Sequence, residues 1–516
     1  MQPWLNDAIF YQIYPQSFHD SNADGIGDFQ GIIQKLDYIQ DTGFNALWLN
    51  PCFDSPFGDA GYDVRDYFLA AKRYGTNEDL KALFHAVHDR GMHILLDLVP
   101  GHTSVECSWF QSSMEPEENP YTHRYVWTNS INKDIAGVSG IAGTIRGISD
   151  RDGCCGVNYY SCQPALNYGF AQCTEAWQQP VDAPGPMATR QAMLEVIRFW
   201  LGLGCDGFRV DMAFSLVKND PDRKQTIALW QDIFSKVSAE FPEAAFVAEW
   251  GAPEQALPAG FDMDFMLHFG PSHYRDLYHC NTPYFSPRGE GSAKEFFAYY
   301  TTVLAQTKAL GGLISFPSGN HDMPRLSYHC DPHQIKLVFA FMMSMPGAPF
   351  VYYGDEIGMR YLPVIRSKEG GYKRTGARTP MQWDNSPNFG FSRAPKALLY
   401  TPQDPAANAP TVASQQEDAD SVLNELKRLM ALRKENPVLQ ASADFKLLCD
   451  DYPMVYLRQL EDCQVLVAIN PTDTQRSCAM ESLCIDRVLY SIGAAATMEG
   501  NTLTVPPLSA SYLVLQ

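Results

Sequence analysis

Hydrophobic positions in the first 350 residues follow two alternating patterns. Runs that are apolar at nearly every position, such as residues 92–99, predict strands that are buried on both faces. Runs with apolar residues three and four apart, such as residues 29–42, predict helices. Strands that alternate with helices of this length indicate a parallel sheet covered by helices.

The alternation continues far enough to close a barrel. The predicted helices span residues 29–42, 77–90, 188–203, 224–240, 293–310 and 334–345. The predicted strands span residues 8–14, 44–49, 92–99, 205–211, 245–250, 262–267, 313–317 and 349–353. Eight parallel strands with helices outside them predict an α/β protein with a (β/α)8 (TIM) barrel.

Two regions depart from the barrel pattern. Residues 101–170 are rich in Gly, Ser, Asn and Tyr, and an unstructured loop of this length is rare, so we predict a subdomain inserted after strand three. A Pro- and Gly-rich loop, 354–414, precedes a last helix, 418–435, and short strands follow it. These strands span residues 445–448, 454–460, 465–469, 487–491, 502–505 and 511–515. We therefore predict a barrel from residues 1–100 and 171–438, with the inserted subdomain, here named subdomain B, at 101–170. A C-terminal antiparallel β-sandwich is predicted at 439–516.

Composition narrows the possible partners. The 516 residues carry a formal charge of -20, which argues against nucleic acid, and the 12% aromatic content suits sugar-stacking clefts. No window approaches the length of a membrane span, and the first residues show no basic and apolar signal sequence. The 13 cysteines include no CxxC pair. We expect mostly free thiols in a cytoplasmic protein, with a small-molecule partner and no membrane contact.

Charged residues recur at the carboxyl ends of the predicted strands, where barrels place their functional groups. Strand four ends in Arg209 and Asp211, strand five in Glu249, and strand seven leads into Asp322. Two carboxylates that face each other across a glycosidic bond can protonate the leaving oxygen and capture the sugar. Residues 207–213 alone are better explained as a structural ion pair. Several strand ends in register instead favour a site for neutral sugars.

Seven short motifs carry a resemblance to a known family. They are DLVPGH (97–102), GFRVDMA (207–213), VAEWG (247–251), SGNHD (318–322), QPALN (163–167), GYD (61–63) and RTPMQW (378–383). With these motifs the chain closely resembles the α-amylase superfamily (glycoside hydrolase family 13) over nearly its whole length. GYD and RTPMQW are similar to the branch of oligo-1,6-glucosidases, α-glucosidases and trehalose synthases.

The resemblance implies roles for the strand-end residues. Asp211 would be the nucleophile, Glu249 the acid and base, and Asp322 a carboxylate that holds sugar hydroxyls and stabilises the transition state. Arg209 would orient Asp211 and keep it ionised, because a nearby cation lowers the pKa of a carboxylate. A retaining mechanism would place the carboxyl groups of Asp211 and Glu249 about 5–5.5 Å apart.

The same resemblance implies a closed sugar pocket. His102 and His321 match residues that bind hydroxyls of the sugar at the cleavage point. Tyr62 would provide a stacking platform, while Asp59 together with Arg378 would close the non-reducing end. A closed end implies exo action on short substrates.

A loop after the first strand has the composition of a metal site. Oxygen side chains stand at positions 1, 3, 5 and 9 of residues 20–28, with Gly at position 6, as in an EF-hand loop, but residue 31 is Gly where that loop has Glu. A turn rich in Asx and Gly is the alternative. Because the same loop binds calcium in related glucosidases, the resemblance implies a structural Ca²⁺ held by Asp20, Asn22, Asp24, the Ile26 carbonyl and Asp28.

Three positions differ from the family pattern. Gly101 replaces an asparagine that, in many amylases, binds a second calcium between the barrel and the insertion, so that second site is in doubt. Ala165 replaces an aspartate of many relatives. Met212 follows the nucleophile, where valine is linked to α-1,6 and small residues to α-1,4 preference, so the linkage stays open.

The leading hypothesis is a retaining exo-acting α-glucosidase. A trehalose synthase or transglucosylase, an endo-acting amylase and a non-catalytic sugar-binding relative are the alternatives.

Overall fold

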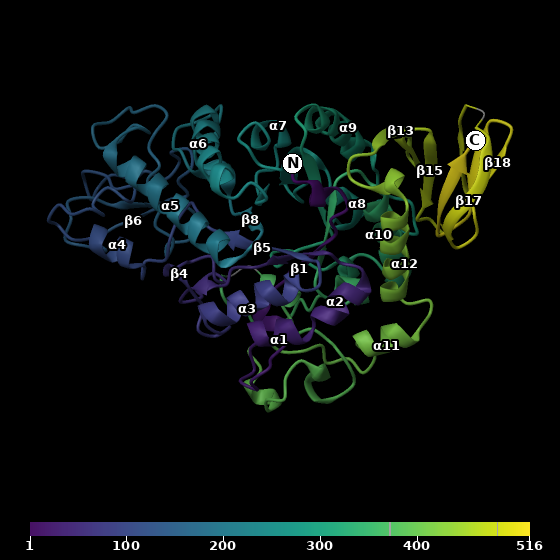
Figure 1. Ribbon diagram of the computed structural model, residues 1–516, viewed down its shortest axis with the longest axis horizontal. Coiled ribbons are helices and arrows are strands. Elements are labelled where there is room, and N and C mark those ends of the chain that lie inside the picture. The colour runs from purple at the N-terminus through teal and green to yellow at the C-terminus, as the bar shows by residue number, and fades with distance from the viewer. Residues whose placement is uncertain (371–372, 482) are drawn as a thin grey trace.

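The computed structural model describes residues 1–370, 373–481 and 483–516, and a closed barrel of parallel strands forms its centre (Figure 1). Its strands are β1 (Phe10–Ile13), β2 (Ala46–Leu49), β5 (His93–Leu98), β8 (Gly207–Val210), β9 (Ala245–Ala248), β10 (Met263–Phe265), β11 (Leu313–Pro317) and β12 (Ala348–Tyr352). Strand β1 pairs in parallel with both β2 and β12, which closes the sheet. The predicted eight-stranded barrel is confirmed.

Helices surround the barrel. They are α1 (Phe29–Gln34), α2 (Leu36–Thr42), α3 (Asn77–His88), α5 (Pro184–Leu203), α6 (Lys224–Glu240), α7 (Pro253–Ala256), α8 (Arg275–Tyr278), α9 (Lys294–Ala309), α10 (Pro332–Ser344), α11 (Val412–Glu417) and α12 (Val422–Glu435). Helix α5 begins four residues before the predicted start, because Pro184 and Pro186 fit the first turn, where no N–H partner is needed.

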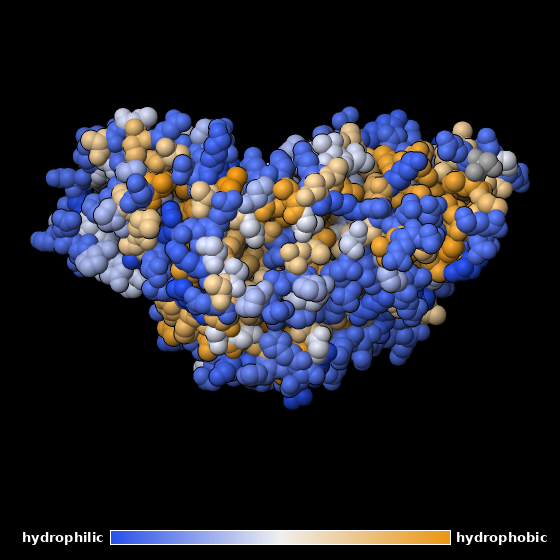
Figure 2. Space-filling view, turned by 45° about the horizontal axis from the view of Figure 1, so that its top comes forward, coloured by the Kyte–Doolittle hydropathy of each residue, from blue (hydrophilic) through white to orange (hydrophobic). Residues whose placement is uncertain are grey.

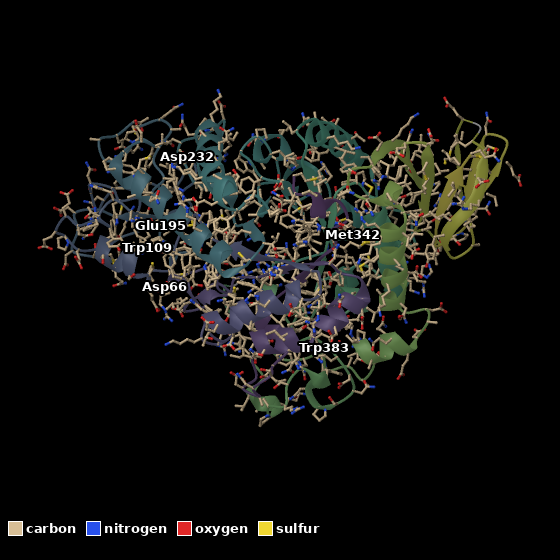
Figure 3. The ribbon with its side chains drawn as sticks, in the orientation of Figure 1. Asp66, Trp109, Glu195, Asp232, Met342 and Trp383 are labelled. Carbon is tan, nitrogen blue, oxygen red and sulfur yellow. The ribbon has the colours of Figure 1, made fainter. Side chains whose placement is uncertain are left out.

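The prediction of one helix over residues 29–42 is wrong. Lys35 leaves the helical conformation, with φ −110° and ψ 4°, and separates α1 from α2. Its ammonium lies 4.4 Å from the ring centroid of Trp383, the last residue of RTPMQW. Figure 3 labels this tryptophan. The Trp383 Nε1 also donates to the Phe18 carbonyl at 3.0 Å. Apolar spacing cannot reveal such a break, because Ile32 and Leu36 are buried on either side of it.

Strand periodicity decides which side chains reach the barrel interior. Phe208 and Val210 pack outward against the helices, so Arg209 between them points inward. The register pairs Arg209 with Asp97 across β5 and β8. Asp211 follows two residues after Arg209 and therefore lies on the same side. Polar groups thus gather at the carboxyl end of a barrel whose lower interior is filled by rings such as Phe10 and Phe350, stacked at 4.1 Å.

The chain between β5 and α5 is mostly irregular. It contains α4 (Ser108–Ser113), β6 (Gly143–Ile145) and β7 (Cys155–Val157), and it lies at one end of the molecule in Figure 1. Part of it has a small core of its own, formed by Val126, Ile135, Ile141, Ala165 and Phe170. A hairpin of β3 (Phe53–Asp54) and β4 (Asp66–Ala70), which the sequence pattern did not indicate, follows β2.

Antiparallel sheets form the C-terminal part, as predicted. One sheet contains β13 (Asp444–Asp450), β14 (Met454–Leu460), β15 (Cys463–Asn470), β20 (Ser509–Leu515) and β17 (Ile485–Ile492). The other contains β16 (Arg476–Ala479), β19 (Thr502–Val505) and β18 (Thr497–Glu499). Strands β16 and β18 were not predicted, because they are short and their side chains are largely exposed. Figure 2 shows hydrophobic side chains at the side of the molecule where these sheets lie.

The cysteines and the helices bear on two further expectations, unpaired thiols and the lack of a membrane span. All thirteen cysteines are free thiols, in line with the expectation of unpaired cysteines. Within residues 1–370, 373–481 and 483–516, no helix is long and apolar enough to cross a membrane.

Candidate active site

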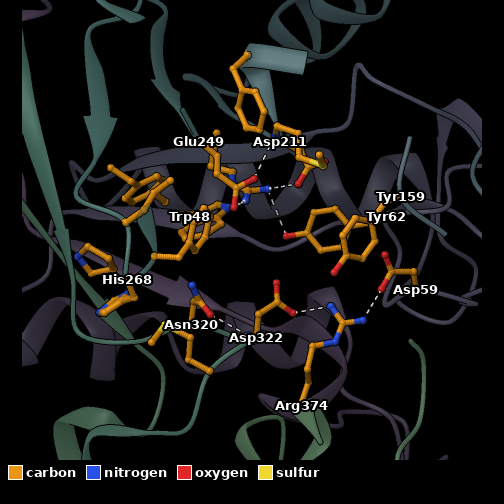
Figure 4. Close-up of a pocket in the computed structure, with 18 of the residues that line it drawn as sticks. Trp48, Asp59, Tyr62, Tyr159, Asp211, Glu249, His268, Asn320, Asp322 and Arg374 are labelled. Carbon is orange, nitrogen blue, oxygen red and sulfur yellow. Dashed lines mark hydrogen bonds and ion pairs between the residues drawn. The ribbon is translucent and has the colours of Figure 1, made fainter. Parts of the chain in front are cut away.

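A cavity of about 460 Å³ opens at the carboxyl ends of the barrel strands (Figure 4). Its polar lining is formed by Asp59, Tyr62, His102, Gln163, Arg209, Asp211, Glu249, His268, Asn320, Asp322 and Arg374. Its apolar lining is formed by Trp48, Tyr159, Met212, Phe214, Phe265, Leu267, Phe269, Pro317 and Met323. Seven of the nine predicted catalytic and substrate-binding residues therefore lie on the cavity wall. The other two, His321 and Arg378, are buried behind it.

One guanidinium joins three carboxylates at the base of the cavity. Arg209 Nη1 lies 2.7 Å from Asp97 Oδ1 and 3.0 Å from Asp211 Oδ1, and Nη2 lies 2.8 Å from Glu249 Oε1. Trp48 Nε1 donates to Asp97 at 3.2 Å, so Asp97 is held from a second side. The resemblance did not single out Asp97, although its place at the end of strand three is the signal that identifies it.

The carboxylates of Asp211 and Glu249 are fixed by different contacts. The Met212 N–H donates to Glu249 Oε2 at 3.0 Å, which complements the Arg209 contact to Oε1. Met212 has a positive φ of 41°, a conformation that non-glycine residues rarely adopt outside sites where the surrounding structure imposes it. Met212, which follows Asp211, thus uses its backbone N–H to orient the Glu249 carboxylate.

The sign of the pKa shift at Asp211 differs from our expectation. Burial raises the pKa of Asp211, the Arg209 guanidinium opposes this, and the charges of Glu249 and Asp97 raise it further. Burial also raises the pKa of Asp97 to about 6. One cation does not compensate the charges of three neighbouring carboxylates, so Asp97 and Asp211 hold a proton more strongly than isolated carboxylates do. Arg209 therefore orients Asp211, while its effect on the ionisation of Asp211 is outweighed.

Asp322 lies across the cavity from Asp211 and Glu249 (Figure 4). Arg374 Nη1 and Arg378 Nη2 lie 2.7 Å and 2.9 Å from its Oδ1. Partial desolvation acts to raise the pKa of Asp322, but the guanidinium groups of Arg378 and Arg374 lower it well below its usual range. Asp322 is therefore ionised at neutral pH.

Asp59 is paired with Arg374, while Arg378, which was predicted to close the pocket together with Asp59, makes other contacts. Asp59 Oδ1 pairs with Arg374 Nη2 at 2.6 Å, and its Oδ2 accepts from Gln163 Nε2 at 2.8 Å. Arg378 instead donates through Nε to the His321 carbonyl at 2.7 Å. The two arginines are four residues apart, and the sequence offers no means to decide which of them faces the cavity. Arg374 and Gln163 are thus site residues that sequence reasoning missed.

The remaining predicted residues form a stacked wall. The rings of Tyr62 and His321 are stacked with centroids 5.2 Å apart, and Tyr62 Oη donates to Asp97 at 3.0 Å. His102 Nε2 is 3.0 Å from the Tyr62 carbonyl oxygen. Burial lowers the pKa of His102 and of His321 to about 3 each, so both imidazoles are neutral.

Asn158 occupies the space that Gly101 leaves open. A Cβ at residue 101 would lie 2.6 Å from Asn158 Nδ2, and this amide is 3.1 Å from His102 Nδ1. Because His102 Nε2 faces a carbonyl, Nδ1 accepts from the Asn158 amide. The departure at Gly101 is therefore accommodated by a second asparagine, distant in sequence, that fixes the histidine.

The loop of residues 20–28 consists of consecutive Asx turns. The Asp20 carboxylate accepts from the Ala23 and Gly25 N–H groups at 2.7 and 2.8 Å, and Asp24 accepts from Ile26 N at 2.8 Å. Asp28 caps α1 by accepting from the Gly31 N–H at 2.6 Å. Among the described residues, no group of three or more His, Cys, Asp or Glu side chains is gathered around a metal position. The oxygen-only donor set still has the chemistry that Ca²⁺ prefers.

The fold and the site together define a class of protein. Three carboxylates at the ends of barrel strands four, five and seven, with neutral histidines and aromatic rings, characterise barrel enzymes that act on carbohydrates. The family description "Alpha amylase, catalytic domain" matches residues 12–141 and 178–442. The protein belongs to this family, glycoside hydrolase family 13.

Related proteins of this family carry more than one activity. The chain is 31% identical to "Trehalose synthase/amylase TreS" of Mycobacterium tuberculosis, covering 90% of this chain and 82% of that protein. It is 30% identical to "Glucan 1,6-alpha-glucosidase" of Streptococcus pneumoniae, covering 97% and 98%. Among solved structures, the trehalulose synthase MutB from Pseudomonas mesoacidophila MX-45 superposes with a TM-score of 0.82 at 26% identity, covering 100% of both chains.

Proposed function

We propose that the protein is a retaining, exo-acting α-glucosidase that hydrolyses short α-linked gluco-oligosaccharides or disaccharides. The observation that carries this proposal is the bridge in which Arg374 joins Asp59 at 2.6 Å and Asp322 at 2.7 Å. This bridge fills one end of the cavity with buried charged groups opposite the reacting carboxylates. A pocket closed in this way accepts one terminal glucose and leaves no space for a longer chain on that side.

The first step forms a glycosyl-enzyme. Asp211, held in place by Arg209, attacks the anomeric carbon as a carboxylate while Glu249 donates a proton to the glycosidic oxygen. The carbon–oxygen bond breaks, the aglycone leaves as an alcohol, and an ester to Asp211 forms. Asp322, kept ionised by two arginines, supports the positive charge that develops on the sugar ring.

The second step returns the enzyme to its starting state. Glu249, now a carboxylate, takes a proton from water, and the water oxygen attacks the anomeric carbon from the face that the aglycone left. The ester bond to Asp211 breaks, which releases α-glucose and restores both carboxyl groups. Two inversions give net retention of the α configuration.

Product analysis tests this function directly. Maltose, isomaltose, trehalose, sucrose and kojibiose should be incubated separately with the protein, and the products should be separated and followed by proton NMR. We expect glucose from at least one of them, with the α anomer formed first. A β anomer as first product, or no reaction with any of the five, would contradict the proposal.

A glucosyl-transferring or isomerising activity is the second candidate. It is favoured by the apolar part of the cavity lining, which includes Phe265, Leu267 and Phe269. Figure 4 shows His268, from the same segment, at the end of the cavity opposite Asp59. Such a wall can hold a leaving sugar or fructose by stacking and keep water away, so the released group recaptures the glycosyl-enzyme. A new disaccharide that accumulates faster than glucose would support this activity over hydrolysis.

We also propose that the loop of residues 20–28 binds a structural Ca²⁺. The proposal is supported by four oxygen side chains and one carbonyl within nine residues and by the cap that Asp28 provides to α1. Asp20, Asn22, Asp24, Asp28 and the Ile26 carbonyl would hold the ion. It would stabilise the loop after β1 and take no part in the chemistry.

A further inference from the structure

Glu369 is a buried carboxylate beside the cavity, and the roles described above do not use it. It belongs to the long loop after β12, and its side chain is only 4% exposed. Its backbone has a positive φ of 47°, a conformation that is strained for any residue with a side chain. A buried charge on a strained backbone persists only where the surroundings hold it.

The carboxylate of Glu369 is bound by four donors. Tyr14 Oη and Gln16 Nε2 donate to Oε2 at 3.2 and 3.0 Å. Arg73 Nη1 donates to Oε1 at 2.8 Å, and Tyr400 Oη donates to the same oxygen. Tyr14 and Gln16 follow β1, and Arg73 follows β4. The side chain therefore fastens the loop after β12 to segments at the opposite end of the chain.

The backbone at Glu369 supports the two arginines of the site. The Glu369 carbonyl accepts from Arg378 Nη1 at 3.2 Å and from Arg374 Nη2 at 3.4 Å. The Gly370 carbonyl also accepts from Arg374 Nη2, at 3.2 Å. Both guanidinium groups contact Asp322 through other N–H bonds. The side chain of Glu369 thus binds the four donors, and its backbone carbonyl binds the two arginines of the site.

We propose that Glu369 is a positioning residue for the closed end of the pocket. Its carboxylate fixes the backbone carbonyls that orient Arg374 and Arg378, and these arginines orient Asp322 and Asp59. The guanidinium plane has directional N–H groups, so a small shift of the supporting carbonyls turns both arginines away from their carboxylates. This inference rests on the proposed function, because it concerns how the pocket binds the terminal glucose.

The variant Glu369→Gln tests the role with little change in shape. It removes the charge that Arg73 needs, and it places an amide N–H₂ among donors. We expect kcat/KM for 4-nitrophenyl α-D-glucoside and for maltose to fall by about 10-fold or more. The Kd of D-glucose, measured by calorimetry, should rise by a comparable factor.

Glu356→Gln is the matched control. Glu356 is also buried in the segment after β12 and accepts from Tyr11 Oη at 2.6 Å and Tyr38 Oη at 3.0 Å, but it does not line the cavity. A purely structural effect of losing a buried carboxylate lowers the melting temperature of both variants. Only Glu369→Gln should weaken glucose binding, while Glu356→Gln should keep kcat/KM within about twofold of the original protein.

Tyr400→Phe provides a second variant that removes a single hydroxyl from the same carboxylate. We expect a smaller fall in kcat/KM, about threefold, and this variant tests the inference by itself if Glu369→Gln does not fold.

Unchanged kcat/KM and glucose affinity in Tyr400→Phe and in a folded Glu369→Gln overturn the inference. An original protein that cleaves no α-glucoside contradicts the proposed function itself, and the inference with it. An active original protein with an unaffected Glu369→Gln contradicts only the inference.

Discussion

Asp59 and Arg374 form a buried ion pair with 2.6 Å between Oδ1 and Nη2. The same guanidinium contacts Asp322 at 2.7 Å, so one side chain couples the far end of the pocket to a carboxylate that faces the reacting centre. A change at Arg374 therefore affects the surroundings of both carboxylates at once.

Replacing Arg374 with lysine should show this coupling. A lysine ammonium cannot present two N–H groups in the plane that joins both carboxylates, so we expect kcat/KM to fall about 10- to 100-fold. Steady-state kinetics on maltose measures the effect. Arg433→Lys, at a buried arginine that binds the Gly347 carbonyl far from the cavity, should lower stability and leave kcat/KM unchanged. Full activity in Arg374→Lys would contradict the proposed pocket.

The variant Asp211→Asn should lose activity by several orders of magnitude and keep its fold. Burial and neighbouring carboxylates raise the folded-state pKa of Asp211, so its contribution to stability is present below the unfolded value of about 3.9 and is lost as pH rises. Asparagine carries no such charge. The melting temperature of the variant relative to the original should therefore increase as the pH rises above about 4. If the difference in melting temperature between variant and original does not change with pH, the pKa of Asp211 is not raised in the folded protein.

Azide should distinguish the two reacting carboxylates. In Glu249→Ala with an activated α-glucoside, azide attacks the glycosyl-enzyme from the face that water uses, and α-glucosyl azide should form. In Asp211→Gly, azide replaces the missing nucleophile, and β-glucosyl azide should form. Proton NMR of the products identifies the anomer. The opposite pattern would exchange the roles of the two residues.

The buried histidines should make the fold sensitive to acid. Burial lowers the pKa of His102 and His321 to about 3, below the value of about 6.5 in an unfolded chain. Stability from the neutral imidazoles is therefore present above about pH 6.5 and is lost as pH falls toward 3, by about 1.4 kcal/mol per unit for each group. His102→Gln should reduce this loss, as measured by urea unfolding at several pH values. His85→Gln, on an exposed face of α3, should not change it.

Calcium should stabilise the protein through the loop of residues 20–28. Ligand binding to the folded state adds about 2.7 kcal/mol at one hundred times Kd, so added Ca²⁺ should raise the melting temperature and EDTA should lower it. Asp24→Ala should abolish the response while activity at low temperature stays the same. Equal melting temperatures in EDTA and in calcium would contradict the proposed site.

The sequence by itself determined the barrel and the residues at its strand ends. Strands such as β5 and β8 are apolar on both faces because helices cover the sheet, and this pattern is local enough to read along the chain. Alternation along a strand then places Arg209 and Asp211 on the same face. The expectation that Asp211, Glu249 and Asp322 lie near one another followed from their places at the carboxyl ends of predicted strands. All three line the cavity, and their catalytic roles stay a prediction.

Only the tertiary structure decided how these groups are paired. Asp59 and Arg374 are 315 residues apart, and the choice between Arg374 and Arg378 depends on how the loop after β12 folds over β1. The net pKa shift of Asp211 likewise depends on burial and on Asp97, which no spacing of residues expresses. Local periodicity records which side of an element is buried, whereas hydrogen bonds and charge balance arise between distant segments only when the chain has folded.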